Sequence, residues 1–148
     1  MNSELRAAAL AYLQQHHVVT LATCTAADLW AAAVFYVNSG FDLIFLSAGH
    51  TRHAQNLAAN PQVAATIQAD YTDWREIKGI QLEGRVQQLT GVEREMAITL
   101  YKTRFPFLQD APPPVQRAFD QVNWYCLTPA HLYLIDNSQG FGHRDQVL

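Results

Sequence analysis

The sequence predicts a mainly β fold with packed helices (α+β), arranged as an antiparallel barrel of six or seven strands. Three observations predict it. Short apolar and β-branched runs recur along the chain, turn signals separate most of them at hairpin spacing, and the strand–helix–strand alternation of a dinucleotide-binding sheet is missing. The Gly-Phe-Gly at 140–142 is not part of a GxGxxG fingerprint after a strand, so dinucleotide binding of that kind is not expected.

The chain opens with a short amphipathic helix at 3–15, because Ser3 can cap it and Leu5, Ala9 and Leu13 share one face. Strands are expected at residues 17–24, 29–37, 41–47, 62–69 and 77–89, and at 122–128 and 131–136, which form one strand or two. Helices are expected at residues 50–60, from 91 to about 103, and at 114–121. Residues 137–148 are expected to be a C-terminal tail.

The strand at 29–37 reads LWAAAVFYV and has no polar face. One side should therefore form barrel core, while the other needs a ligand or a partner chain to cover it. The strand at 77–89 alternates instead, with Ile80, Leu82 and Val86 on one face and polar side chains on the other. After it, Thr90 and Glu93 have the spacing of a capping box for the next helix.

Size and composition favour a single domain over residues 1–148. Charged residues make up 16% of the chain, below the average of about 25%, which suggests that some surface is hidden in an oligomer. The net charge of −3 and the lack of any Lys or Arg run argue against a nucleic-acid partner. Cys24 and Cys126 form no CxxC pair, and the N-terminus is neither signal peptide nor membrane span, so a cytoplasmic protein is expected.

The segment SAGHTRHAQNL (47–57) is the best candidate for a binding site. A strand ends there, and Thr51, Arg52 and His53 begin a helix within a few residues. The free amides and the dipole of a helix N-terminus favour an anion, and Arg can hold a phosphate with two parallel hydrogen bonds. This pattern indicates a phosphate site, although a capped surface helix with a solvated Arg has the same local pattern.

The same stretch carries a resemblance to a known family. The two-faced apolar strand, the Asn-Ser-Gly turn and the helix TRHAQNLAANP resemble the FMN-binding split-barrel proteins, the pyridoxamine-phosphate-oxidase-like family. In that family a basic residue is followed by x-x-N-L and later by N-P, which here are His53 to Leu57 and Asn60-Pro61. Three later segments are similar to the YhbP-like branch of the family: 78–89, 101–106 and 133–144. The similarity covers nearly the whole chain in the same order.

The resemblance implies a split β-barrel of the FMN-binding type that forms a homodimer with FMN at the subunit interface. It implies that the flavin ring is lined, largely by backbone groups, at Ala33, Val34 and Phe35. It places around the phosphate the side chains of Ser47, Thr51, Arg52 and His53. The activity implied is that of an FMN-dependent oxidoreductase acting on a small molecule that the sequence does not identify.

Two positions depart from the family's pattern. His53 stands where a lysine is usual, so its charge near neutral pH depends on its surroundings. The glutamine that many oxidases of the family direct at the flavin has no direct match, because Gly79 falls near that position and Gln81 follows two residues later on the same strand face. Oxidation of pyridoxamine phosphate itself is therefore not expected.

Other interpretations stay open at this point. The protein could be a flavin-binding dimer without enzymatic activity, a haem-binding split barrel, for which its six histidines are suitable, or a dimer without cofactor. His50 and His53 are three residues apart but have no carboxylate or cysteine near them in sequence, so no metal site is predicted. His143 and Arg144 follow two glycines and either belong to a mobile terminus or reach a neighbouring site.

Overall fold

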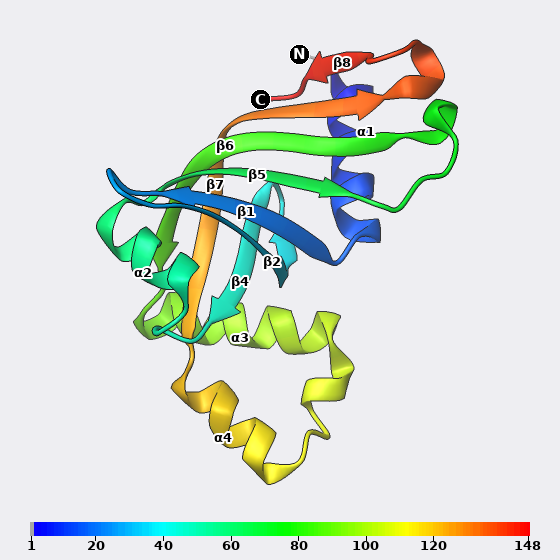
Figure 1. The fold of residues 1–148 in the computed structure, drawn as a ribbon. Helices are drawn as coiled ribbons and strands as arrows, with labels where there is room; N and C mark the ends of the chain where they lie inside the picture. The colour runs from blue at the N-terminus through cyan, green and yellow to red at the C-terminus, as the bar shows by residue number, and fades with distance from the viewer. Residues whose placement is uncertain (1) are drawn as a thin grey trace.

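In the computed structural model, which describes residues 2–148, eight antiparallel strands form one sheet (Figure 1). The strand order is β2-β1-β5-β6-β7-β4-β3, and β8 pairs with β7 outside this path. The strands are β1 (Val18–Cys24), β2 (Leu29–Phe35), β3 (Val37–Ser39), β4 (Asp42–Ser47), β5 (Gln62–Gln68), β6 (Lys78–Gln88), β7 (Asn123–Asp136) and β8 (Arg144–Gln146). The helices are α1 (Ser3–Gln15), α2 (Arg52–Ala59), α3 (Gly91–Arg104) and α4 (Pro113–Gln121).

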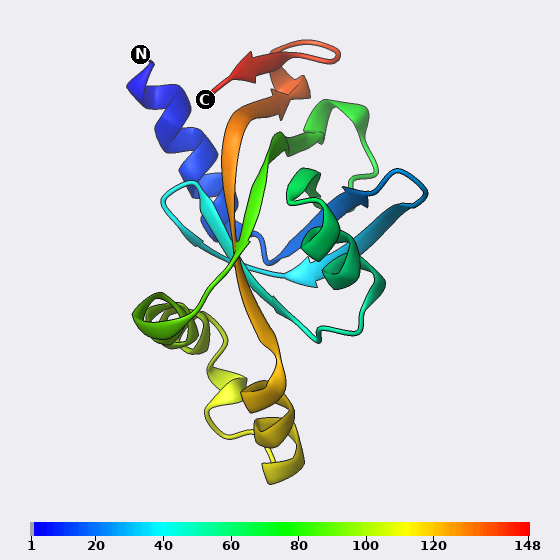
Figure 2. The same ribbon diagram turned by 90° about the vertical axis from the view of Figure 1, so that its left-hand side faces the viewer.

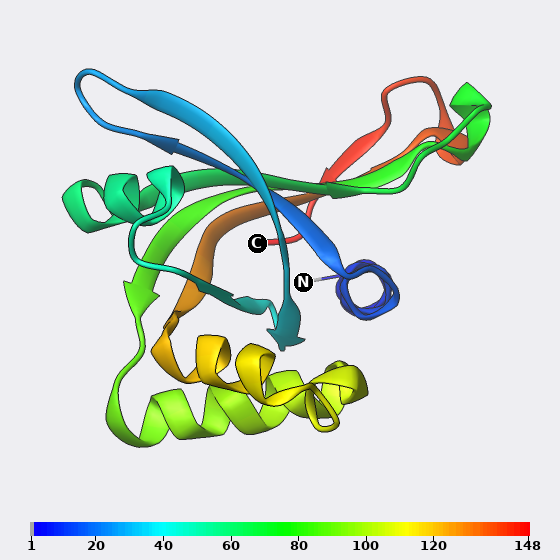
Figure 3. The ribbon, with the colours of Figure 1, turned by 60° about the horizontal axis from the view of Figure 1, so that its bottom comes forward.

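The sheet curls until its two edges meet. Strands β2 and β3 lie at opposite ends of the strand order, yet only Tyr36 separates them in the chain. Tyr36 is fully buried, and its hydroxyl donates a hydrogen bond of 2.7 Å to the carbonyl oxygen of Leu13 on α1. Figure 3 shows the curled sheet with α1 seen end-on beside it. The predicted antiparallel α+β barrel is therefore confirmed.

Two hydrophobic clusters hold the fold together. The larger one fills the inside of the curl and contains Leu21, Phe45, Ile67 and Leu127, all with no exposed surface, together with Leu13 of α1. The smaller one lies under α3, where Tyr101 packs edge-on against Trp124 with ring centroids 5.2 Å apart. Helices α3 and α4 gather at one end of the molecule, and both chain termini lie at the other (Figures 1 and 2).

Strands β6 and β7 are long and share a β-bulge. Glu83 pairs with His131, but Gly84 pairs with Pro129, so Ala130 has no partner on β6. A bulge is where a strand tolerates proline, because one ladder hydrogen bond is already missing. Position 84 requires glycine because the backbone of β7 passes very close to it. An added Cβ would lie 2.9 Å from Pro129 Cα and closer still to the carbonyl oxygen of Thr128.

Helix α2 packs on the tip of the β1–β2 hairpin. The side-chain amide of Asn56 is buried and donates to Thr23 Oγ1 at 3.1 Å and to Asp28 Oδ2 at 3.0 Å. Thr51 is the N-cap of this helix, and its hydroxyl accepts from the amide of Ala54 at 3.3 Å. The hairpin tip and the start of α2 are thus held as one unit.

Several boundaries differ from the sequence-based expectation. The strand expected at 29–37 breaks at Tyr36, because its buried aromatic ring turns the chain from one edge of the sheet to the other. The two C-terminal segments form one continuous strand, and the expected tail contains the 3₁₀ turn Asn137–Gln139 and strand β8. The predicted capping box at Thr90 is wrong, because no side chain makes a capping hydrogen bond at the start of α3. Asn2 rather than Ser3 caps α1.

None of the helices between residues 2 and 148 combines the length and the apolarity needed to span a bilayer.

Candidate functional site

One face of strands β2, β1, β5, β6 and β7 points away from the core, and we call it the outer face. Its composition follows from the strand registers, because directly paired residues lie on the same side of a sheet. One row across it, the alanine row, consists of Ala31, Ala22, Ala64, Glu83 and His131. The next row, the glutamine row, consists of Ala33, Thr20, Thr66, Gln81 and Tyr133. The outer face is therefore floored by small side chains at β2, β1 and β5, and polar at β6 and β7.

The apolar half of the outer face is exposed in the single chain. Leu29 is 77% exposed, Phe35 51% and Val18 44%. Large apolar side chains gathered on one exposed face mark a surface that a ligand or partner covers. The strand at 29–37 was predicted to form core with one side, and only Val34 and Ala32 of β2 are even partly buried. The second side is exposed in the single chain.

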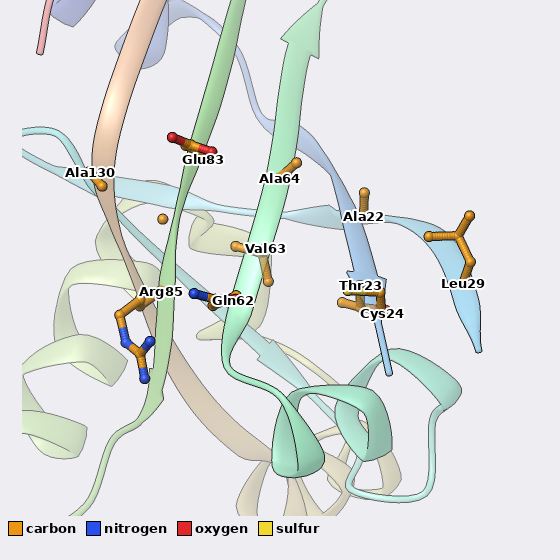
Figure 4. Close-up of a pocket in the computed structure, with 11 residues that line it drawn as sticks. Ala22, Thr23, Cys24, Leu29, Gln62, Val63, Ala64, Glu83, Arg85 and Ala130 are labelled. Atoms are coloured by element: carbon orange, nitrogen blue, oxygen red, sulfur yellow. The ribbon is translucent and has the colours of Figure 1, made fainter. Parts of the chain in front are cut away.

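A hollow of about 490 Å³ lies at the hairpin end of the outer face (Figure 4). Its apolar wall comes from β1, β2 and β5, with Ala22, Leu29 and Ala64. Its polar wall comes from the bulged pair of strands and includes Glu83 and Arg85. The hollow therefore combines a flat apolar floor with a few convergent polar groups, the usual make-up of a small-molecule site.

Three predicted phosphate-site residues meet at the junction of β4 and α2. Ser47 Oγ lies 2.6 Å from His53 Nε2 and 3.0 Å from Thr51 Oγ1, and the hydroxyl of Thr51 lies 3.4 Å from the same imidazole nitrogen. Ser47 is 6% exposed, so its hydroxyl is held in place by these contacts. We call Ser47, Thr51 and His53 the helix-start cluster.

The imidazole of His53 is partly buried, and this burial lowers its pKa below the ordinary value. Desolvation disfavours the charged form of a buried histidine. Burial therefore favours the neutral form of His53, so the groups that the helix-start cluster presents near neutral pH are hydroxyls, a neutral imidazole and the free amides of the first helical turn.

Arg52 does not point into this cluster. Its Nε donates to Asp28 Oδ2 at 2.8 Å, its Nη2 donates to the other carboxylate oxygen, and its guanidinium lies 4.1 Å from the centroid of the Trp30 ring. The hydrogen bonds from Arg52, and then from Asn56, lower the pKa of Asp28 to about 2. Arg52 thus joins α2 to the hairpin tip, and the Nε–Nη2 edge of its guanidinium is occupied by Asp28.

The predicted site residues therefore fall into three groups. Ala33, Phe35 and Gln81 share the outer face, although they come from strands that are far apart in the sequence. Val34 lies between Ala33 and Phe35 with its side chain against the core, so only its backbone can take part in a site on the outer face. Ser47, Thr51 and His53 form the helix-start cluster, and Arg52 is held beside it by Asp28.

Two features of the site were not predicted from the sequence. Asp28 is the partner of both Arg52 and Asn56, and a TAAD turn gives no sign of this. His131, to which no sequence pattern gave a role, lies on the outer face with its Nδ1 2.6 Å from Glu83 Oε1. The alternation of β6 does place Glu83 on the same face as Gln81, which is the one signal that could have pointed to it.

The segment that carries His143 and Arg144 is ordered as a strand rather than a free tail. The guanidinium of Arg144 lies 4.6 Å from the centroid of Tyr133, at the end of the glutamine row. His143 Nε2 lies 2.8 Å from Asp145 Oδ2. Strand β8 therefore places Arg144 next to the outer face of its own chain.

Comparison with known proteins agrees with this architecture. The sequence pattern of the family described as pyridoxamine 5'-phosphate oxidase matches residues 5–136. A UPF0306 protein of Photorhabdus laumondii is 36% identical over 135 residues, covering 90% of this chain and 88% of the relative. A putative pyridoxamine 5'-phosphate oxidase from Listeria innocua superposes with a TM-score of 0.67 at 17% identity, over 86% of this chain and 95% of that one.

Among solved structures of the same fold, HutZ, the haem storage protein from Vibrio cholerae, has a TM-score of 0.71 at 19% identity, over 86% of this chain and 92% of that one. An FAD-binding protein from Mesorhizobium loti has a TM-score of 0.69 at 14% identity, over 90% of this chain and 94% of that one. At these identities the likeness is one of fold. The matched residues and the curled antiparallel sheet together show that this chain is a split-barrel protein of the pyridoxamine 5'-phosphate oxidase family.

Proposed function

We propose that this protein binds FMN as a homodimer, with the flavin on the outer face between two copies, and acts as an FMN-dependent oxidoreductase on a small molecule. One observation carries the proposal. The strand registers bring Ala33 and Gln81 into a single exposed row, and Phe35 onto the same face. The family resemblance assigns Ala33 and Phe35 to the cofactor, and Gln81 stands two residues beyond the position near which the family's glutamine falls. Ala33 and Gln81 are exposed, and Phe35 remains 51% exposed although its ring packs against Phe105.

Two separate places in the chain, the outer face and the helix-start cluster, each carry groups that suit one chemical part of FMN. A flat ring system needs a flat apolar floor, and Ala31, Ala33 and Ala64 supply exposed methyl groups with Thr20 and Thr66 beside them. A phosphate monoester needs several hydrogen-bond donors, and the helix-start cluster supplies two hydroxyls and an imidazole at the first turn of α2. Arg52 adds a bidentate donor once it leaves Asp28.

A second copy completes the site by covering the apolar half of the outer face. Leu29, Phe35 and Val18 would then be shielded from water. Each Å² of apolar surface buried in this way stabilises the dimer by about 25 cal/mol. When bound, FMN supplies the two-electron chemistry, and the chain binds it, orients it and excludes water from it. The thiols of Cys24 and Cys126 are free, which suits a reducing compartment such as the cytoplasm.

An absorption spectrum tests the cofactor. The purified protein is incubated with FMN, freed of excess by gel filtration and scanned, and we expect it to retain the bands of oxidised flavin. NADH and NADPH are then added without oxygen, and bleaching of these bands by either one supports an oxidoreductase. Retained flavin that neither nucleotide reduces would favour the non-enzymatic flavin-binding alternative. A colourless protein would contradict FMN binding.

Haem is the second candidate cofactor. His131 presents an imidazole on the outer face, where a flat macrocycle could lie on the same alanine floor. Solved structures of this fold include a haem-binding protein from Mycobacterium smegmatis, with a TM-score of 0.75 at 21% identity. A Soret band after addition of hemin, together with no uptake of FMN, would favour haem over the flavin.

The uncharged state of His53 predicts a pH dependence of FMN binding. A bound phosphate next to the imidazole favours its protonated form, so FMN binding should take up part of a proton. By linkage, affinity should rise by about three- to tenfold from pH 8 to pH 6. Calorimetry in two buffers of different ionisation enthalpy measures the proton uptake directly. His53→Gln should lose it, and an identical proton count in the variant would contradict the assignment of His53 to the phosphate.

The same residue predicts how the apo protein responds to acid. Its folded-state pKa is depressed, so below the ordinary imidazole pKa of about 6.5 the unfolded chain binds more protons than the folded one. The free energy of unfolding should therefore fall as the pH drops from 7 to 5. Urea denaturation of the wild type and of His53→Gln at both pH values measures this, and the variant should lose less stability. Equal losses would mean that His53 is not held uncharged.

A further inference from the structure

A solvent-exposed histidine–carboxylate pair lies beside the hollow, with its carboxylate in the lining. His131 Nδ1 lies 2.6 Å from Glu83 Oε1, and the two side chains are 50% and 65% exposed. An exposed pair of this kind contributes little to stability, because solvent screens it. Both residues end the alanine row, and Glu83 lines the hollow itself.

The β-bulge sets the position of this pair. Ala130 is the extra residue on β7, so His131 resumes its pairing with Glu83 only beyond the irregularity. Figure 4 shows Glu83 and Ala130 side by side on the neighbouring strands at the edge of the hollow. Bulges redirect side chains and are common next to active sites. The close approach that only Gly84 allows fixes the bulge at this point.

The contact with Glu83 decides which imidazole nitrogen is available. A carboxylate accepts a hydrogen bond, so Nδ1 carries the proton and Nε2 carries the lone pair in the neutral ring. Nothing else between residues 2 and 148 hydrogen-bonds this imidazole. Nε2 can therefore accept a proton from a bound molecule or, once protonated, return it, with Glu83 stabilising the imidazolium.

The surroundings of His131 contain few other ionisable groups. The ionisable side chains nearest to it are Glu83 and Arg85 on β6 and Tyr133 on β7. Arg144 of β8 lies over the ring of Tyr133. The neighbouring strand β5 contributes Gln62, Ala64, Thr66 and Gln68 to this face, none of which is ionisable. Cys24 of β1 stands at the hairpin end of the hollow. Among residues 2–148 no histidine lines the hollow, and His131 is connected to it through its contact with Glu83.

We propose that His131 is the acid–base residue of the outer-face site and that Glu83 is its positioning residue. The inference rests on the proposed flavin function. When a reduced nicotinamide gives up a hydride to a bound flavin and becomes the oxidised nicotinamide, the flavin would be left as the anionic hydroquinone, which takes up one proton to become neutral. The imidazolium of His131 gives that proton from Nε2 and is reprotonated from solvent. In the reverse direction the neutral ring accepts it.

Nitrogen-15 NMR of the histidine side chains tests the geometry without any turnover. In the wild type the neutral ring of His131 should be the Nδ1–H tautomer, and its Nε2 signal should shift when FMN is added. Glu83→Ala should return the ring to the Nε2–H form that is usual in water. The second histidine–carboxylate pair, His143 with Asp145, lies away from the hollow and is the matched control. Its signals should not respond to FMN.

Kinetics test the role. His131→Gln should keep its FMN affinity but slow reduction of the bound flavin by NADH or NADPH at least about a hundredfold, the usual contribution of an acid–base group. His131→Ala should regain part of the rate with added imidazole, whereas His143→Gln should behave as the wild type. Normal reduction in His131→Gln, or FMN binding that leaves the His131 signals unmoved, would overturn this inference alone.

Two other outcomes would also decide which cofactor binds. A wild type that takes up no FMN would overturn the proposed function and this inference together. A Soret band with hemin that disappears in His131→Gln would identify His131 as an iron ligand instead, which also overturns the acid–base role.

Discussion

Gly84→Ala is expected to lower the free energy of unfolding by about 3 kcal/mol, at the upper end of the usual cost of overpacking. The added methyl group would meet Pro129 Cα at 2.9 Å and the Thr128 carbonyl oxygen closer still. These are backbone atoms of the adjoining strand, so no side chain can rotate away. Urea denaturation followed by circular dichroism measures the loss as a lower midpoint at an unchanged slope.

Gly49→Ala is the matched control for this substitution. Its Cβ would lie 3.1 Å from the side-chain nitrogen of Asn123, which can move, so the cost should stay below about 1 kcal/mol. If both variants lose the same stability, the close approach of β6 and β7 at the bulge is not what requires glycine. Gly84→Ala should also alter the Nδ1 signal of His131, because Glu83, which pairs with His131, is the residue next to Gly84 in the chain.

Arg52→Ala is expected to weaken FMN binding at least tenfold. One or two charge-assisted hydrogen bonds to the phosphate would be lost, each of about 1.5–3 kcal/mol. The structure adds a condition, because Asp28 holds the guanidinium that the phosphate needs. A fluorescence titration of FMN against the wild type and the variant measures the change in affinity.

Asp28→Asn separates binding from structural support. It keeps the shape of the side chain but removes the charge that competes for Arg52, so FMN should bind more tightly than in the wild type. If Arg52 serves only to fasten α2 to the hairpin, both variants should change stability while FMN affinity stays the same. Unchanged affinity in Arg52→Ala would remove Arg52 from the phosphate site.

Much of the fold follows from local sequence pattern. The alternation of apolar and polar residues predicts β6 to within a residue at each end, and Asn60-Pro61 ends α2 where expected. The break at Tyr36 is not visible locally, because a buried tyrosine fits an apolar strand as well as a corner. Strand β8 reads Arg-Asp-Gln and has no apolar pattern, so only its pairing with β7 makes it a strand.

The candidate site was predictable where it is local in sequence. Ser47, Thr51 and His53 lie within seven residues, and the turn from strand to helix brings them together. The partners of Arg52 and His131 come from distant segments, Asp28 and Glu83, and depend on helix docking and on the shifted register of the bulge. No pattern in a single sequence reports a register shift, which is why both pairs emerge only in three dimensions.

Native mass spectrometry of the protein with added FMN tests the central claim most directly, because it reports the number of chains and of cofactors in one spectrum. The outer face, uncovered in a single chain, should be closed by a second copy with flavin between them. We therefore predict a species of two chains and two FMN molecules that survives removal of free FMN. A single chain without FMN would contradict both the partner and the cofactor assigned to this face.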